Sequence, residues 1–307
     1  MMGLSHNALW VLASMLMLGT AAGLAGCFAY WKRQSLMSDA LAHAALPGVV
    51  IGFAILGFKS LPVMLLGAAA SALLGAWAVT AIRAHSRVKE DTAMGIILSV
   101  FFGLGIMLLT MVNRMPGGGQ SGLDGFIFGQ AAAMVRQDMR TMTAVAAVVL
   151  LAVLISFKEW KLYLFDPAFA RGIGLSGRLM EAAYLTLLVV IIVIGIQAVG
   201  VILMAALLII PAVSARYWTN AFGTMLALSA LFGGGAGVAG TWVSTLGAGW
   251  PTGPFIVIAA AGTFLLSLVF GTRKGLLVKA MQRREQMRHL ELRAVRRDPL
   301  AEREALP

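Results

Sequence analysis

Residues 182–215 read AAYLTLLVVIIVIGIQAVGVILMAALLIIPAVSA and contain no charged side chain. A helix needs roughly 20 apolar residues to cross the hydrocarbon core of a bilayer. This stretch of 34 residues is therefore too long for one straight crossing and short for two. Gly195, Gln197 and Gly200 interrupt it near its middle and predict a break between two short helices. The number of times this stretch crosses the membrane decides the topology of the fold.

Further long uncharged segments flank this stretch. We expect membrane helices over residues 7–31, 40–58, 60–82, 92–113 and 141–157. Residues 217–272 are long enough for two helices, and the Gly- and Pro-rich residues 244–254 predict the break between them. Charged residues make up 12% of the chain, against roughly 25% in a soluble domain. We therefore predict an all-α, polytopic membrane protein.

The distribution of Lys and Arg selects between the two topologies. Cytosolic loops carry an excess of these residues. If residues 182–215 cross twice, nine helices place 20 of the 24 Lys and Arg on the side of the C-terminus and four on the other. If they cross once, the eight helices divide these residues into 9 and 15. We expect nine transmembrane helices, with eight as the alternative, and the C-terminus in the cytosol.

The same pattern divides the chain into a transmembrane domain, residues 1–272, and a basic cytosolic tail, residues 273–307. The first apolar run is too long for the core of a signal peptide, so we interpret it as a retained span. The net charge of +11 has no recognised nucleic-acid-binding motif beside it, so we expect no nucleic-acid partner. The single cysteine, Cys27, excludes a disulfide framework or a cysteine-based metal site.

Sequence motifs for nucleotide hydrolysis or protease chemistry are missing from the chain. It contains no G-x-x-x-x-G-K-[ST] phosphate loop, no H-E-x-x-H and no nucleophile elbow. We therefore predict that the protein is not an enzyme. If it pumps, its energy comes from ATP bound elsewhere or from an ion gradient.

The segment SLMSDALAHAALPG, residues 35–48, brings ionisable groups to the start of the second span. Asp39 and His43 are four residues apart and share one face of a helix. Such groups inside a span are costly and mark functional sites, and carboxylate with imidazole suits first-row divalent cations. The alternative is that Asp39 caps the helix and only pairs with His43. Two ligands are too few to hold a metal, so a second copy of the chain or other residues must complete any site.

The stretch KEWKLYLFDPAFARGIGLSGR, residues 158–178, lies between spans on the cytosolic side. Asp166 is a good N-cap and Pro167 a good first helical residue, and glycines follow at 172 and 174. We expect a short helix that presents Phe165 and Phe169. An exposed apolar patch marks a partner surface. The alternative is that these rings pack against the ends of the protein's own helices.

Two other stretches have structural explanations. Glu90 and Asp91 open the fourth span, where acids favour a helix N-terminus. Residues 199–216, VGVILMAALLIIPAVSAR, are rich in small residues, which helix packing explains.

Five of these phrases together resemble the permease subunits of bacterial manganese, zinc and iron ABC importers. They are residues 35–48, 90–95 (EDTAMG), 165–175 (FDPAFARGIGL), 199–216 and 251–257 (PTGPFIV). The resemblance extends from the first span to about residue 272, and its most specific phrase contains Asp39 and His43. Ser38 is a departure, since many relatives have Gly there.

The resemblance implies a vitamin-B12-importer-like permease fold, that of type II ABC importers, in a bacterial inner membrane. The permease would act as a dimer of identical or paralogous chains. Cytosolic ATPase subunits would dock on Phe165, Asp166, Pro167, Phe169 and Arg171, and an extracytoplasmic metal-binding protein would deliver the ion. Asp39 and His43 would contact the metal in transit, and no cofactor would be bound permanently. The phrase at residues 165–167 is more similar to the manganese and iron branch than to the zinc branch.

Other functions fit less well. A zinc importer is the second interpretation. A proton-coupled secondary transporter predicts several acids in mid-span, and a membrane enzyme or sensor predicts a catalytic cluster or a soluble domain. Neither pattern is present in the sequence. Permeases for vitamin B12 and siderophores carry large ligands, and usually lack an Asp–His pair at this position.

Overall fold

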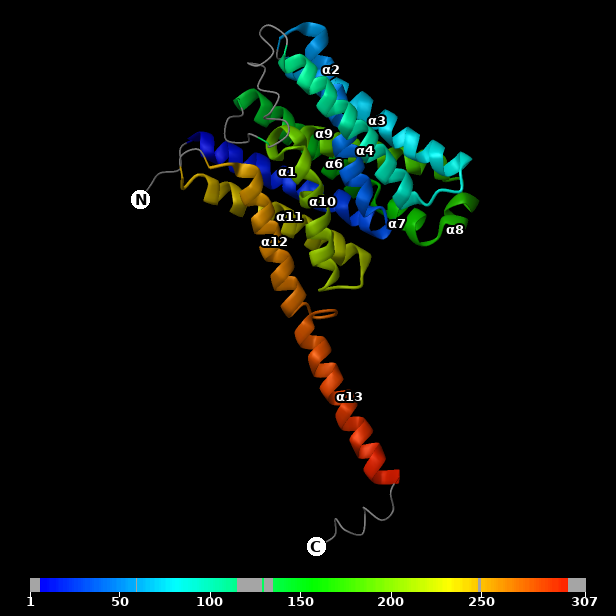
Figure 1. Cartoon of the computed structure of the whole chain (residues 1–307). Coiled ribbons are helices and arrows are strands. Elements are labelled where there is room, and N and C mark those ends of the chain that lie inside the picture. The colour runs from blue at the N-terminus through cyan, green and yellow to red at the C-terminus, as the bar shows by residue number, and fades with distance from the viewer. Residues whose placement is uncertain (1–5, 59, 115–128, 130–134, 248–249, 298–307) are drawn as a thin grey trace.

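The computed structural model describes residues 6–58, 60–114, 129, 135–247 and 250–297. Within these residues all regular secondary structure is α-helical (Figure 1). In chain order the helices are α1 (His6–Trp31), α2 (Ser35–Leu56), α3 (Leu61–His85), α4 (Glu90–Asn113), α6 (Arg136–Ile155), α7 (Phe157–Phe165), α8 (Pro167–Gly172), α9 (Gly177–Val199), α10 (Val201–Arg216), α11 (Phe222–Ser244), α12 (Thr252–Phe270) and α13 (Leu276–Arg297).

Eight of the described helices are long and apolar enough to cross a membrane: α1, α2, α3, α4, α6, α9, α11 and α12. The ninth predicted segment, α10, has 16 residues. At 1.5 Å per residue it is about 24 Å long, shorter than the roughly 30 Å hydrocarbon core. Residues of α10 pack against α1, α2, α11 and α12, so this short helix lies inside the bundle.

The predicted break within residues 182–215 falls at Gly200, whose φ of 95° ends α9 and precedes α10. Gly195 and Gln197 are part of α9 and do not interrupt it. The expectation of two short halves is wrong for the first of them, because α9 begins at Gly177 and has 23 residues. Arg178 and Glu181 belong to its first two turns, where long charged side chains can reach the membrane surface. The predicted break between α11 and α12 is confirmed.

Glycines allow several helix pairs to approach closely, as is typical of membrane bundles. A Cβ on Gly48 of α2 would lie 2.0 Å from the carbonyl oxygen of Gly67 in α3. A Cβ on Gly19 of α1 would lie 2.3 Å from that of Gly233 in α11. Neither approach tolerates a larger residue, which explains part of the high glycine content.

The second helix, α2, is central in the bundle and packs against α3, α4, α9 and α10. Among residues 40–50, His43 alone is not buried. One histidine is thus the only point at which the middle of this helix opens outward.

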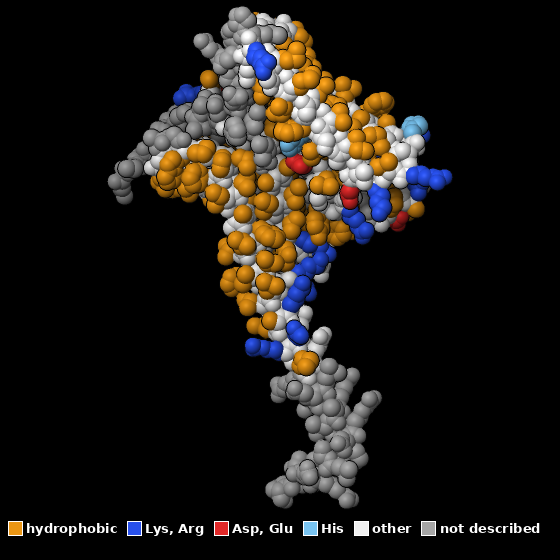
Figure 2. Space-filling model, viewed as in Figure 1, with side chains coloured by type: hydrophobic (Ala, Val, Ile, Leu, Met, Phe, Trp, Pro, Cys, Tyr) orange, Lys and Arg blue, Asp and Glu red, His pale blue; other side chains and the backbone are white. Residues whose placement is uncertain are grey.

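The helix α13 extends away from the bundle and carries basic residues (Figure 1). It belongs to the basic tail predicted at residues 273–307, of which residues 298–307 lie outside the described part. In the view of Figure 2, Lys and Arg side chains gather chiefly at the end of the bundle near α7 and α8 and along the start of α13, whereas the rest of the face is largely apolar. This charge asymmetry agrees with the predicted topology.

Candidate functional site

Asp39 and His43 meet on α2 as the sequence predicts. His43 Nδ1 lies 3.3 Å from Asp39 Oδ1 and 3.0 Å from the Asp39 carbonyl oxygen. The alternative of a capping role for Asp39 is wrong, because α2 begins at Ser35 and its N-cap is Gln34. When Nδ1 carries the proton and donates to Asp39, the Nε2 lone pair remains free to bind a metal.

The pair is open to the outside of the chain. The side chain of Asp39 is 34% exposed and that of His43 is 12% exposed. The His43 ring packs in a T-shaped arrangement with Phe102 of α4, with 4.9 Å between centroids and 75° between the ring planes, which restrains the imidazole. No group of three or more His, Cys, Asp or Glu in the described part of the chain could hold a metal. The pair therefore offers two ligands.

The predicted short helix is α8, and Asp166 is its N-cap. The Asp166 carboxylate accepts a hydrogen bond of 2.9 Å from the Phe169 backbone N–H, and Pro167 is the first helical residue. Gly174 has a φ of 92°, so the chain turns there into a conformation that suits glycine. The Phe169 side chain is 57% exposed, and Arg171 is also exposed. The local structure of this stretch is as predicted.

Phe165 differs from Phe169, because it ends α7 and packs against the bundle. Its ring centroid lies 4.9 Å from that of Trp31 and 5.5 Å from that of Phe222. Trp160 of the same helix is buried against Phe28, with 5.2 Å between centroids. These aromatic contacts fix α7, and therefore the start of α8, to the ends of α1 and α11. For Phe165 the alternative of packing on the protein's own helices is thus correct in part, since half of its surface remains exposed.

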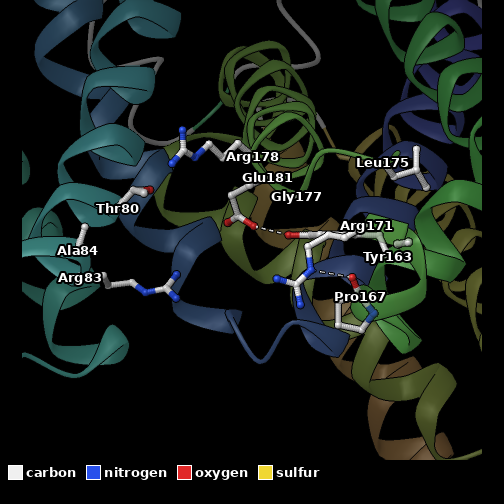
Figure 3. Close-up of a pocket in the computed structure, with 11 residues that line it drawn as sticks. Thr80, Arg83, Ala84, Tyr163, Pro167, Arg171, Leu175, Gly177, Arg178 and Glu181 are labelled. Carbon is white, nitrogen blue, oxygen red and sulfur yellow. Dashed lines mark hydrogen bonds between the residues drawn. The ribbon is translucent and has the colours of Figure 1, made fainter. Parts of the chain in front are cut away.

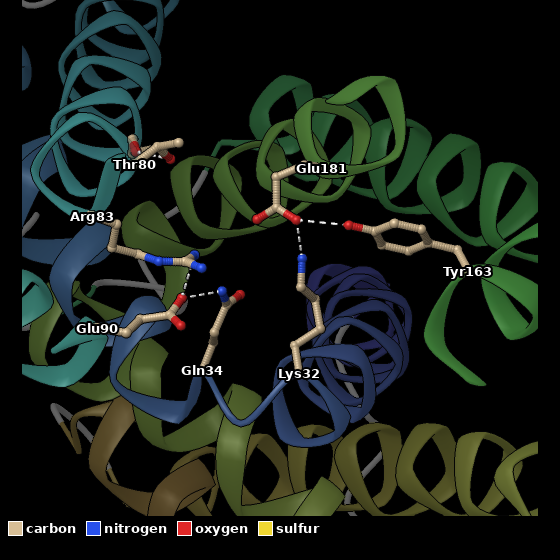
Figure 4. A network of polar contacts seen from close by, with 8 residues as sticks. Lys32, Gln34, Thr80, Arg83, Glu90, Tyr163 and Glu181 are labelled. Atoms are coloured by element: carbon tan, nitrogen blue, oxygen red, sulfur yellow. Dashed lines mark hydrogen bonds and ion pairs between the residues drawn. The ribbon is translucent and has the colours of Figure 1, made fainter. Parts of the chain in front are cut away.

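A polar network joins the three-residue link between α1 and α2 to more distant helices (Figure 4). Lys32 forms an ion pair with Glu181 of α9, and the Tyr163 hydroxyl donates a 3.0 Å hydrogen bond to the same carboxylate. The ammonium of Lys32 also lies 4.4 Å from the centre of the Tyr184 ring. Burial and the Glu181 charge raise the pKa of Tyr163 to about 12, so its hydroxyl stays protonated and donates.

The other half of the network holds the start of α2. Gln34 donates to Glu90 at the beginning of α4, and Arg83 near the end of α3 donates to the same carboxylate at 2.8 Å. Arg33, between the two halves, has a φ of 59°, which is uncommon for a residue with a side chain. The link that leads into the helix of Asp39 is therefore held from both sides.

Sequence reasoning did not find this network. The sequence predicts for Glu90 only a place at the start of α4, and Glu90 does lie in the first turn of that helix. Lys32 counts in the sequence only as one of the Lys and Arg that set the orientation of the protein in the membrane. Glu181 borders an uncharged stretch, but no pattern in the sequence pairs it with Lys32. The only available signal was that each charge stands at the end of a span.

Comparison with known proteins identifies the family. A family model described as the ABC 3 transport family matches residues 5–271. The chain belongs to this family. The resemblance seen in the sequence phrases is therefore confirmed, and the chain is a multi-pass membrane protein.

Relatives within the ABC 3 transport family carry names of metal transport systems. The chain is 49% identical to the manganese transport system membrane protein MntC of Bacillus subtilis (strain 168), over 90% of its own length and 63% of that protein's. It is 45% identical to the zinc transport system membrane protein TroC of Treponema pallidum (strain Nichols), over 89% and 92% of the two chains.

The fold is also that of a solved structure. A chain of PsaBC from Streptococcus pneumoniae, in complex with Fab, aligns with a TM-score of 0.76 and 34% identity, covering 88% of this chain and 93% of that one. The predicted all-α membrane permease fold is confirmed by this likeness.

Proposed function

We propose that this protein is the membrane-spanning permease subunit of an ATP-driven importer of divalent transition-metal ions, with manganese as the main substrate and iron beside it, and with a zinc importer as the alternative. The observation that supports this most strongly is the Asp39–His43 pair. It is a carboxylate and an imidazole within 3.3 Å, and His43 is the one point where the buried middle of α2 opens outward. The ABC 3 family model places the same protein among ABC transport components.

The pair suits a transient metal contact. Carboxylate and imidazole together bind manganese, iron and zinc. A second permease subunit, identical or paralogous, would present its own pair across the dimer and bring the ligands to four. Four such ligands at a constriction bind the ion firmly enough to replace part of its water and weakly enough to release it.

The energy would come from separate ATPase subunits, so the permease itself is not an enzyme. The exposed Phe169 and Arg171 of α8, with Phe165, Asp166 and Pro167 at its start, form the proposed docking site. A series of contacts connects α8 with Asp39 and His43. Phe165 packs on Trp31, and the link after Trp31 leads into α2. A docked ATPase that moves α8 would therefore act on the helix of Asp39.

The remaining components follow from this assignment. An extracytoplasmic metal-binding protein would deliver the ion to the outer face of the permease, which would reside in the inner membrane of a bacterium. The transported metal is cargo, with no permanently bound cofactor. Residues 1–272 would form the permease and residues 273–307 its cytosolic tail.

A zinc importer is the alternative. The zinc transport system protein TroC is 45% identical to this chain, close to the 49% of the manganese system protein MntC. Carboxylate and imidazole are ligands of zinc as well. Uptake of the metals in competition is therefore part of the test.

The experiment measures uptake of radiolabelled manganese into proteoliposomes that contain the permease with its ATPase and binding protein, with unlabelled iron and zinc as competitors. Asp39→Asn and His43→Ala should each reduce uptake to background, because the first removes the charge of the carboxylate ligand and the second removes the imidazole. The matched controls are Asp91→Asn and His85→Ala, which change an exposed acid and an exposed histidine elsewhere. They should transport normally.

Normal uptake by Asp39→Asn and His43→Ala would show that the pair does not carry the ion. If unlabelled zinc suppresses the uptake of labelled manganese far better than unlabelled manganese does, the importer would be assigned to zinc instead. Uptake without any ATPase would exclude an ATP-driven importer.

A further inference from the structure

Two cavities meet at the end of α3 and the start of α9. One cavity, of about 480 Å³, lies beneath α8 and is lined by Thr80, Arg83, Tyr163, Arg171, Arg178 and Glu181, among others. The second, of about 320 Å³, is a mostly apolar groove between α3 and α9. Thr80, Arg178 and Glu181 line both cavities, so a charged end and an apolar end adjoin at these residues.

The charged end carries surplus positive charge. Figure 3 shows Arg83 and Arg171 reaching into the cavity from opposite sides, with Glu181 between them. Glu181 is already occupied by Lys32 and Tyr163. Arg178 has no acidic partner within the described residues, and Arg171 uses only its Nε, which donates to the Pro167 carbonyl. Arg83 donates one Nη to Glu90 and keeps its other donors. Guanidinium donors therefore remain for an anion, and phosphate oxygens suit their geometry.

The apolar end faces outward from two membrane helices. It is lined by Leu73 and Trp77 of α3 and by Leu185 of α9. Trp77 is 69% exposed and Leu73 is 42% exposed, so the groove opens on the side of the bundle where lipid chains lie. Tryptophan is typical of the membrane–water interface, which places the charged end at the depth of the headgroups.

We propose that these adjoining cavities together bind an anionic glycerophospholipid, with the phosphate between Arg83, Arg171 and Arg178 and an acyl chain in the groove beside Trp77. Basic pockets between membrane helices are known to suit such headgroups. A free phosphate would leave the groove empty, and an acidic segment of a soluble partner would not enter it. The bound headgroup joins α8 to α3 and α9, and so braces the exposed α8 against the bundle.

The test uses the full-length permease in an uncharged detergent, with native mass spectrometry to measure bound lipid. Phosphatidylglycerol should bind at least roughly tenfold more tightly than phosphatidylcholine with the same acyl chains. Its headgroup has a net negative charge that the arginines can bind, whereas phosphatidylcholine has no net charge. Arg178→Gln should lose roughly tenfold in phosphatidylglycerol affinity, the usual effect of one lost charge-assisted hydrogen bond. Ala182→Phe, which fills the groove and changes no charge, should weaken binding of the same lipid.

Two controls match these variants. Arg114→Gln removes an exposed arginine at the end of α4, and Ala183→Phe enlarges an exposed α9 residue that lines neither cavity. Both should bind phosphatidylglycerol like the wild type, and a loss equal to that of the test variants would overturn the site. Inorganic phosphate that displaces the lipid at equal concentration would overturn it in favour of a free-anion site. Lipid binding unchanged by Arg178→Gln, together with weaker ATPase binding, would instead assign the arginines to an acidic partner.

Discussion

The two polar clusters of this permease differ in how they are built. Asp39 and His43 are four residues apart on one helix, so the turn of the helix alone brings them together. Lys32 and Glu181 are separated by 149 positions and meet only because α1, α7 and α9 pack together. The first cluster could be predicted from a fourteen-residue phrase, and the second could not.

They also differ in surroundings, although the exposures are similar, 11% and 26% for Lys32 and Glu181 against 12% and 34% for His43 and Asp39. The Lys32 side chain is 11% exposed and is enclosed by a carboxylate and two tyrosine rings. Asp39 is 34% exposed and opens outward. Removing one member of an enclosed ion pair leaves a charge without compensation, whereas a group at an open face regains water. The network should therefore matter for stability, and the Asp39–His43 pair for the proposed transport.

The largest expected effect on stability is that of Lys32→Met. It leaves the Glu181 carboxylate without its cation and should destabilise the permease by about 3 kcal/mol, the lower end for broken buried pairs because Glu181 is partly exposed. Thermal unfolding of the detergent-solubilised protein measures this as a lower melting temperature. The double variant Lys32→Met with Glu181→Met should recover most of the loss.

Lys89→Met is the matched control, since Lys89 is exposed and has no acidic partner in the described part of the chain. Its melting temperature should stay close to that of the wild type. If Lys32→Met and Lys89→Met have the same melting temperature, the network does not stabilise the fold. It would then not differ from the Asp39–His43 pair in its effect on stability.

An intermediate effect is expected at α8, where the exposed ring of Phe169 contrasts with the packed ring of Phe165. Phe169→Asp should weaken ATPase binding by about 2 kcal/mol, or roughly 30-fold, as is common for an aromatic anchor. Co-purification and titration of the ATPase measure this, while the melting temperature of the permease alone should not change. Met281→Asp, at an exposed position of α13, is the control and should bind normally. Wild-type ATPase binding and uptake in Phe169→Asp would exclude α8 as the docking site.

The smallest expected effect on stability is that of Asp39→Asn. Asp39 is not a helix cap, and Asn keeps a side-chain oxygen that accepts from His43 Nδ1. The free energy of unfolding should change by no more than about 0.5 kcal/mol. The same melting assay checks this, next to the loss of uptake expected for this variant. A drop as large as that of Lys32→Met would mean that the metal pair is a structural contact.

Much of the fold could be predicted because membrane helices have a strong sequence signal. A bilayer demands long apolar runs, so the spans, the break at residues 244–254 and the interruption at Gly200 are all visible in the chain. The uncharged run begins at residue 182 because Arg178 and Glu181 precede it, whereas α9 begins at Gly177. Charged side chains are tolerated in the first turns when they reach the interface or a partner, which composition alone does not reveal.

The sequence by itself determined the apolar spans, the local structure of α8 with its Asp166 cap, and the side-by-side placement of Asp39 and His43. Each depends on contacts within one helix or on the thickness of the membrane. Only the tertiary structure decided that His43 opens outward from a buried helix, that Phe165 packs while Phe169 does not, and that Lys32 meets Glu181. These features depend on which helix faces are buried against distant parts of the chain, and burial of this kind has no short-range pattern in a sequence that is apolar almost throughout.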